Sequence, residues 1–285
     1  MYGSGGAAHS LTINAHLGEP HMTVIAEPEK KTLQLSDYSL VGADSKRAVE
    51  MGLAEADWYQ SPVPRDTMRQ LLERRDGPAL RDTILWFGLL GLFGYLGFLW
   101  WGTWWAILPF AVYGMLYGSS ADSRWHESSH GTAFKTDWMN NVLYEIASFM
   151  VTRESTVWRW SHTRHHSDTI IVGRDPEIAV PRPPNLKDFV LSFFGIPALL
   201  AYWRKVLLHC TGRMDPEEET YIPASEYGKI YFKARIYVLI YAAFFAACFV
   251  TGSILPLMYV FLPNLYGSWL MPVFGFTQHA GLAEN

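Results

Sequence analysis

Two long stretches of this chain contain no Asp, Glu, Lys or Arg. The first is the 39 residues Thr83–Ala121, and the second is the 48 residues Ile236–Ala283. A bilayer crossing needs ~20 mostly apolar helical residues at ~1.5 Å of rise each, so each stretch is about twice the required length. We therefore expect an all-α polytopic membrane protein with two transmembrane helical hairpins. A buried hairpin in a soluble all-α protein is the alternative, and the run lengths disfavour it.

Internal turns divide the two stretches into four predicted spans. In the first stretch the aromatic cluster Trp100–Trp105 marks the turn, because Trp favours the membrane–water boundary. In the second stretch Thr251, Gly252 and Ser253 mark the turn, and three prolines should kink the limb that follows it. The predicted spans are about 83–101, 104–121, 236–251 and 254–272, and the prolines are Pro256, Pro263 and Pro272.

The positive charges predict an orientation. All 23 Lys and Arg residues lie before Thr83 or between Arg124 and Arg235, and neither hairpin turn carries one. Positive residues concentrate on the cytoplasmic side, so we expect both termini and the segment 122–235 to be cytoplasmic in a multi-pass protein. A net charge of −4 without a basic excess argues against nucleic acid as a partner. The two cysteines, Cys210 and Cys248, make neither a disulfide scaffold nor a CxxC zinc pair.

Three regions follow from this pattern. We expect a disordered N-terminus over 1–36, a cytoplasmic or interfacial pre-membrane region over 37–82, and the membrane domain over 83–285. Within the second region, Arg65–Arg75 predicts a short basic amphipathic helix that lies on lipid headgroups or on a solvated surface. Residues 189–203 are uncharged but too short to span, so we expect an interfacial or re-entrant segment there.

Six of the ten histidines fall into three clusters next to predicted membrane boundaries. His126 and His130 are four residues apart, and His162, His165 and His166 are three and four apart, so each set projects from one face of a helix. Imidazoles gathered on one face repel each other when protonated, and neutral imidazole is a good ligand for transition metals, so the pattern predicts metal binding. The third cluster contains His279. His209 stands apart beside Cys210, and we expect a structural or exposed role for it.

The predicted topology brings the three clusters to one side. No span lies between His130 and His166, and two lie between His166 and His279, so the chain returns to the same face. Six imidazoles exceed the three or four ligands of one catalytic zinc, which suggests two metal ions. Histidine-rich ligation with open positions suits iron that activates O₂, since zinc has no redox chemistry.

The motifs HESSH at 126–130 and HTRHH at 162–166, flanked by membrane hairpins, resemble those of the membrane fatty acid desaturase family. Membrane alkane and xylene monooxygenases are related to it. QHAGL at 278–282 resembles the family's additional histidine motif. The resemblance implies two iron ions, O₂ as co-substrate, a fatty acyl chain as substrate, and an external electron donor of ferredoxin or cytochrome b type. It also implies that Asp175, in the sequence Gly-Arg-Asp-Pro, orients a histidine, although a structural turn explains this motif equally well.

One departure from the family pattern concerns the end of the sequence. The family carries a further HxxHH or QxxHH box some tens of residues after the motif that QHAGL resembles, and this sequence ends at Asn285. We therefore expect a fragment with six of the eight or more ligands. We expect that fragment by itself to hold two irons weakly and to turn over little.

Three other functions remain open from the sequence. A membrane di-iron hydroxylase acting on an alkane or alkyl chain would use the same ligands. His126–His130 also reads HExxH, so an intramembrane zinc metalloprotease with Glu127 as general base is a remote alternative, which would leave HTRHH without a role. A metal transporter or sensor is disfavoured, because transport ligands usually lie within spans near the bilayer midplane.

Overall fold

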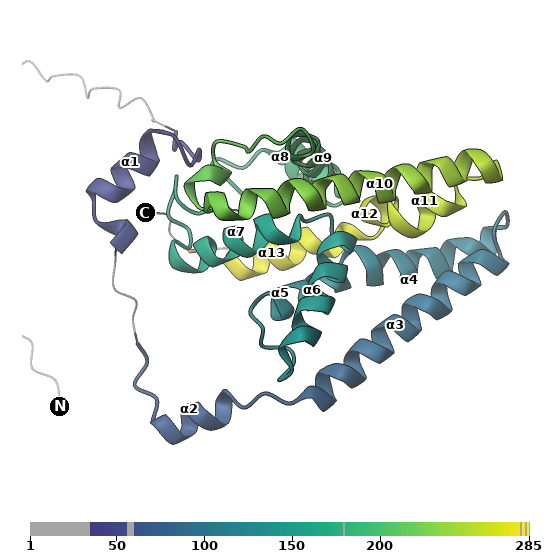
Figure 1. Cartoon of the computed structure of the whole chain (residues 1–285), viewed down its shortest axis with the longest axis horizontal. Coiled ribbons are helices and arrows are strands. Elements are labelled where there is room, and N and C mark those ends of the chain that lie inside the picture. Colours follow the sequence, from purple (N-terminus) through teal and green to yellow (C-terminus); the bar gives the residue numbers. More distant parts are fainter. Residues whose placement is uncertain (1–34, 56–59, 179, 280, 283, 285) are drawn as a thin grey trace, which may run out of the picture. The chain divides into compact units, whose positions relative to one another are not determined.

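A computed structural model describes residues 35–55, 60–178, 180–279, 281, 282 and 284, with the side chains of Glu55 and His279 excepted. Throughout these residues the regular secondary structure is helical, as the sequence predicts (Figure 1). The predicted disordered segment 1–36 lies outside the described residues, apart from its last two. The short helices of the pre-membrane region are α1 (Ala43–Glu50), η1 (Leu53–Glu55) and α2 (Arg65–Leu71), and the last ends earlier than the predicted amphipathic helix.

The first hairpin forms where the charge-free stretch predicts it. Helix α3 (Asp76–Leu99) is followed by a turn through Gly102, the short helix η2 (Trp104–Ala106), and α4 (Ile107–Gly118). Gly102 has φ 83°, a left-handed conformation that favours glycine. The two limbs are joined by a hydrogen bond from Nε1 of Trp86 to the carbonyl oxygen of Leu116, 3.0 Å away.

The second hairpin is asymmetric. Its first limb is the long helix α10 (Tyr227–Thr251), which ends at Gly252 in a left-handed conformation (φ 61°). Its second limb is divided into α11 (Leu255–Val260), α12 (Pro263–Tyr266), η5 (Ser268–Leu270) and α13 (Met271–His279), instead of the single kinked span that the sequence predicts. The predicted prolines account for two of the breaks, because Pro256 and Pro263 lie in the first turns of α11 and α12, where a missing N–H is tolerated.

By length and composition, two helical segments of the described chain can cross a membrane, Arg65–Leu99 and Ala224–Thr251. The pair α8 (Leu186–Ser192) and α9 (Ile196–Cys210) adds a third only if it is counted as one span, because its axes bend by 86°. Gly195, with φ 64°, lies at this bend. This geometry is that of a broken span or of a re-entrant loop, and the interfacial or re-entrant segment that the sequence predicts for residues 189–203 corresponds to the second of these.

Small residues bring the second hairpin against the first. A Cβ atom on Gly267 would lie 1.9 Å from the carbonyl oxygen of Gly114, so only glycine allows this close approach of α4 to the α12–η5 turn. Ser119 Oγ donates a 2.6 Å hydrogen bond to the carbonyl oxygen of Gly267 in the same contact. Close backbone contact through Gly and Ser is typical of helix packing in membranes, where apolar burial between helices contributes little.

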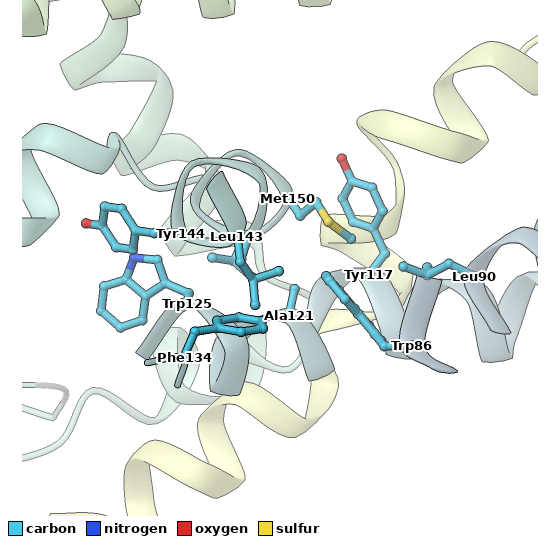
Figure 2. Packing of buried hydrophobic residues seen from close by; sticks show 11 residues of the cluster. Trp86, Leu90, Tyr117, Ala121, Trp125, Phe134, Leu143, Tyr144 and Met150 are labelled. Carbon is cyan, nitrogen blue, oxygen red and sulfur yellow. The ribbon is translucent and has the colours of Figure 1, made fainter. Parts of the chain in front are cut away.

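The histidine-bearing segment shares a core with the first hairpin. This segment comprises α5 (Ser120–Ser129), α6 (Asp137–Met150) and α7 (Ser155–Ser167). Two short helices, η3 (Glu218–Thr220) and η4 (Ala224–Glu226), come later in the chain and precede α10. Figure 2 shows Trp125 of α5 beside Tyr144 of α6, with their ring centroids 6.3 Å apart. The same cluster continues through Leu143 and Tyr117 to Trp86 of α3 (Figure 2). The helix that carries the first histidine motif is therefore anchored to the first hairpin by a continuous apolar core.

Candidate metal centre

Helices α5 and α7 place four imidazoles around one point. His126, His130, His162 and His166 each offer one ligand nitrogen, and these nitrogens all lie within 4.8 Å of one another. Nε2 of His162 is 3.1 Å from Nε2 of His130 and 3.1 Å from Nε2 of His166. A metal ion bonded to nitrogens at ~2.0–2.1 Å holds neighbouring ligand nitrogens roughly 3.0–3.4 Å apart. The geometry of these four residues therefore fits a bound transition-metal ion.

The other two predicted ligands, His165 and His279, do not belong to this group of four. The ring of His165 lies beside this cluster, with its centroid 5.6 Å from that of His166 and 5.9 Å from that of His162. Its Nδ1 atom faces the carboxylate of Asp175, at 2.9 and 3.0 Å from the two oxygens. His279 is the last residue of α13, and its side chain lies outside the described residues.

Three imidazoles of the cluster, those of His126, His130 and His166, resist protonation. Burial lowers the pKa of His126, His130 and His166, and the neighbouring imidazole of His162 lowers each further, to about 4 for His130. Neutral imidazole is the form that binds metal ions, because its free nitrogen lone pair is the ligand. These three imidazoles are therefore held in their ligating form at neutral pH.

Carboxylates contact the Nδ1 atoms of two histidines of the second motif, His162 and His165. Nδ1 of His162 lies 3.0 Å from Oε2 of Glu177, whose other oxygen accepts a 2.9 Å hydrogen bond from Ser161. Burial by itself raises the pKa of Glu177, but the hydrogen bond from His162 and the charges of His162, Arg153 and His165 together outweigh it, so the pKa lies below its ordinary value. Burial by itself lowers the pKa of His165, but the hydrogen bond to Asp175 and the negative charges of Asp175 and Glu177 together raise it above its ordinary value. A carboxylate at Nδ1 directs Nε2 toward a metal, so Asp175 lies where an orienting residue is expected.

Sequence reasoning identified Asp175 and missed Glu177. The two residues are adjacent carboxylates in one turn, since the backbone N–H of Glu177 donates a 2.8 Å hydrogen bond to Oδ1 of Asp175. The only available signal was position, because Glu177 immediately follows Asp175 and Pro176 in the sequence. Pairing a carboxylate with a histidine 15 residues away requires the fold of the loop that follows α7.

An arginine joins the helices beneath the cluster. The guanidinium of Arg153 lies 3.9 Å from the ring centroid of Trp125 and 4.5 Å from that of Trp158, and it forms an ion pair with Asp122. Cation–π contacts of this kind stabilise a partly buried arginine. Trp125 in turn lies against His162, with ring centroids 5.1 Å apart. These contacts fix α5 and α7 relative to each other.

Two cavities of opposite character adjoin the histidines. A polar cavity of about 360 Å³ opens on the cluster itself, and its wall includes His130, Arg159 and His166. A second cavity of about 450 Å³ is mainly apolar and reaches His165, Asp175 and Glu177. Its remaining wall is formed chiefly by apolar side chains of the 170–189 segment and α13, among them Ile170, Ile178, Val180, Leu186, Phe189 and Phe276. The histidine cluster is thus accessible to polar molecules and lies next to a pocket of the size that holds small apolar ligands.

His209 belongs to a separate buried site. Its Nδ1 and Nε2 atoms lie 2.8 Å from Glu154 and 2.8 Å from Glu218, and its side chain is fully buried. Lys205 adds a 2.8 Å ion pair to Glu218. Burial lowers the pKa of His209, but the two carboxylates raise it to about 9. Of the structural and exposed roles that the sequence left open for His209, the buried ion pairs support the structural one.

The fold and this histidine site define an all-helical protein with candidate membrane spans and a metal-binding geometry at their edge. A family model described as fatty acid desaturase matches residues 102–285, which is more than half of the chain. The chain belongs to the fatty acid desaturase family. No curated protein and no solved structure matches it.

Proposed function

We propose that this protein is a membrane-bound, O₂-dependent di-iron oxidoreductase that introduces a double bond into a fatty acyl chain. The observation that carries the proposal is the convergence of four imidazole nitrogens from α5 and α7 within 4.8 Å of one another. Membership of the fatty acid desaturase family supports the same chemistry. Two iron ions, when bound, supply the activation of O₂ that this reaction needs.

The proposed overall reaction balances with a two-electron donor. The acyl chain loses two hydrogen atoms, and two electrons and two protons from the donor complete the reduction of one O₂ to two waters. The protein's residues bind and orient. His126, His130, His162 and His166 hold metal, while Glu177 and Asp175 hold the Nδ1 atoms of His162 and His165. We assign His165 and His279 as further ligands.

The apolar cavity is the proposed site of the acyl chain. Its inner wall contains His165 and Asp175, which are 8% and 4% exposed, whereas Leu186 at its rim is 72% exposed. An apolar chain that enters from the rim would thus be held beside the second histidine motif with water excluded. The electron donor is an external protein of ferredoxin or cytochrome b type. We expect it to act on the side of the polar cavity, where His130 and His166 are exposed.

Placement in the membrane follows from the charge distribution. We propose that α3 and α10 span the bilayer and that the histidine-bearing helices lie on the cytoplasmic side, because every Lys and Arg lies outside the hairpin turns. Accessibility labelling of single cysteines near His130 and near Gly252 tests this orientation, and equal protection of both sites from a membrane-impermeant reagent would contradict it.

The decisive experiment is product analysis. The full-length protein is expressed in cells with a matching electron donor, and the acyl chains are analysed by mass spectrometry. Loss of two hydrogen atoms is expected, and gain of one oxygen atom would indicate the alternative, a hydroxylase acting on an alkyl chain. His162→Ala is the control that removes the central ligand. Formation of the product by this variant at the wild-type level would contradict the proposal.

A further inference from the structure

The loop that follows α7 contains an isoleucine in an unusual backbone conformation. Ile170 has φ 64°, in the left-handed region where a β-branched residue is an outlier, because its side chain crowds the backbone there. Glycine adopts this conformation without that crowding. The same loop uses glycine three residues later, at Gly173 (φ 75°), where a Cβ atom would lie 2.4 Å from the backbone nitrogen of Ser45. The sequence therefore keeps a bulky side chain at 170 where glycine fits the backbone better.

The conformation is held by the carboxylate that also holds a histidine of the second motif. The backbone N–H of Ile170 donates a 2.8 Å hydrogen bond to Oδ2 of Asp175, and Nδ1 of His165 contacts both oxygens of the same carboxylate. The backbone N–H of Asp175 donates a 2.9 Å hydrogen bond to the carbonyl oxygen of Ile171, which closes the loop. Asp175 thus couples the position of Ile170 to the orientation of the His165 ring.

The side chain of Ile170 lies in the wall of the apolar cavity. Ile170 lines that cavity together with His165, Asp175 and Glu177, which form its polar inner part. Residues held in sparsely populated backbone conformations cluster at ligand clamps and active sites, where the surrounding structure imposes them. A branched apolar side chain in the same cavity wall as His165 takes up space that an acyl chain would otherwise fill.

We propose that Ile170 is a specificity-determining residue that sets the depth of the acyl chain and hence which methylene lies beside His165. This inference rests on the proposed function, because it takes the apolar cavity as the acyl site. It adds that the α7–Asp175 loop, through one strained residue, selects the carbon that reacts.

The test uses photo-crosslinking with a series of fatty acids that carry a diazirine at successive carbons. The full chain is labelled in detergent or nanodiscs, and the crosslinked peptides are mapped by mass spectrometry with unlabelled fatty acid as competitor. In wild type we expect one carbon position to dominate the saturable crosslinks to residues 165–178. In Ile170→Ala and Ile170→Gly the dominance is lost, and crosslinking spreads over neighbouring carbons with at least a threefold rise at the deeper positions.

Two matched variants control the experiment. Thr152 is a second β-branched residue with a positive φ (51°), and it is not among the residues that line the cavity. Thr152→Gly removes the same kind of backbone strain and should leave the crosslinking pattern as in wild type. Ile170→Val keeps a branched side chain and should also retain the pattern, which separates a wall contact from a general effect of substitution at this position.

The outcomes distinguish this inference from the function on which it rests. If wild type shows no saturable crosslink to the cavity segment, the acyl site itself is misassigned and the proposed function loses its substrate pocket. If wild type shows one dominant position and Ile170→Ala shows the same one, Ile170 does not set the depth. Should Ile170→Gly fail to fold, the Ala and Val variants still decide the question. In the active system the double bond is expected to form at more than one position in Ile170→Ala.

Discussion

The two histidine sites of this protein lie in opposite electrostatic environments. In the cluster of α5 and α7 the imidazoles face one another, and burial together with the neighbouring His162 lowers the pKa of His126, His130 and His166. At His209 the imidazole faces two carboxylates, which raise its pKa to about 9. Those three imidazoles are kept neutral, whereas His209 is itself the cation of its site.

The electrostatic surroundings of a histidine thus distinguish a metal-binding role from a structural role, without the use of sequence motifs. A histidine with both nitrogens against carboxylates is satisfied when protonated and has no lone pair to offer. Nitrogens 3.1 Å apart, as for His162 and its neighbours, are stabilised when a proton or a metal ion lies between them. The carboxylates near the cluster contact Nδ1 atoms, so they leave Nε2 of His162 directed to the shared point.

Removal of the central imidazole should have the largest effect on metal binding. We expect His162→Ala to lower the affinity for a divalent probe such as Co²⁺ by more than about 100-fold, because Nε2 of His162 contacts two of the other three ligand nitrogens. Titration followed by the visible spectrum of bound Co²⁺ measures this. His209→Gln is the matched control, and an equal loss of affinity there would remove the distinction between the two groups.

Removal of the carboxylate behind that imidazole should have a smaller effect. Glu177→Gln is expected to lower Co²⁺ affinity by about 10–100-fold, the range typical of residues that orient a metal ligand. Glu127→Gln is the matched control, because Glu127 is an exposed carboxylate next to His126 in sequence. Loss of activity in Glu127→Gln with full metal binding would instead favour the HExxH metalloprotease.

Disruption of the second group should affect stability and spare the metal site. His209→Gln leaves Glu154 buried without its cation and Glu218 with Lys205 alone, and breaking a buried pair in this way costs on the order of 3–5 kcal/mol. Thermal unfolding in detergent is the measurement. An unchanged unfolding temperature would show that the two carboxylates are neutral or hydrated in the folded protein.

The pH dependence of stability should carry the smallest signature. The folded-state pKa of His209 is raised to about 9 from an ordinary value near 6.5, so its stabilisation is complete below the ordinary value and is lost as the pH rises through 9. Glu154, Glu218 and Lys205 are the charged groups that face it. The difference in unfolding temperature between wild type and His209→Gln should therefore shrink between pH 6.5 and 9, and a constant difference would contradict the assigned charge.

Much of the fold could be predicted because apolar run length is a property of sequence alone. The first hairpin and the C-terminal end of α10 lie where the charge-free stretches and their turns predict them. The second limb of the second hairpin could not be predicted in detail. Its prolines predicted kinks. Its division into α11, α12, η5 and α13 also depends on the contact of Gly267 with Gly114, which lies more than 150 residues earlier.

The candidate site divides in the same way. Helical spacing alone places His126 with His130, and His162 with His166, on common helix faces, since the period of an α-helix is a local property. Tertiary structure decided that the two faces meet, that Glu177 and Asp175 stand behind His162 and His165, and that the two carboxylates around His209 make it a buried cation. These contacts depend on the fold of the loops and on the pairing of buried charges. Neither periodicity nor composition specifies which distant side chains will pair with one another.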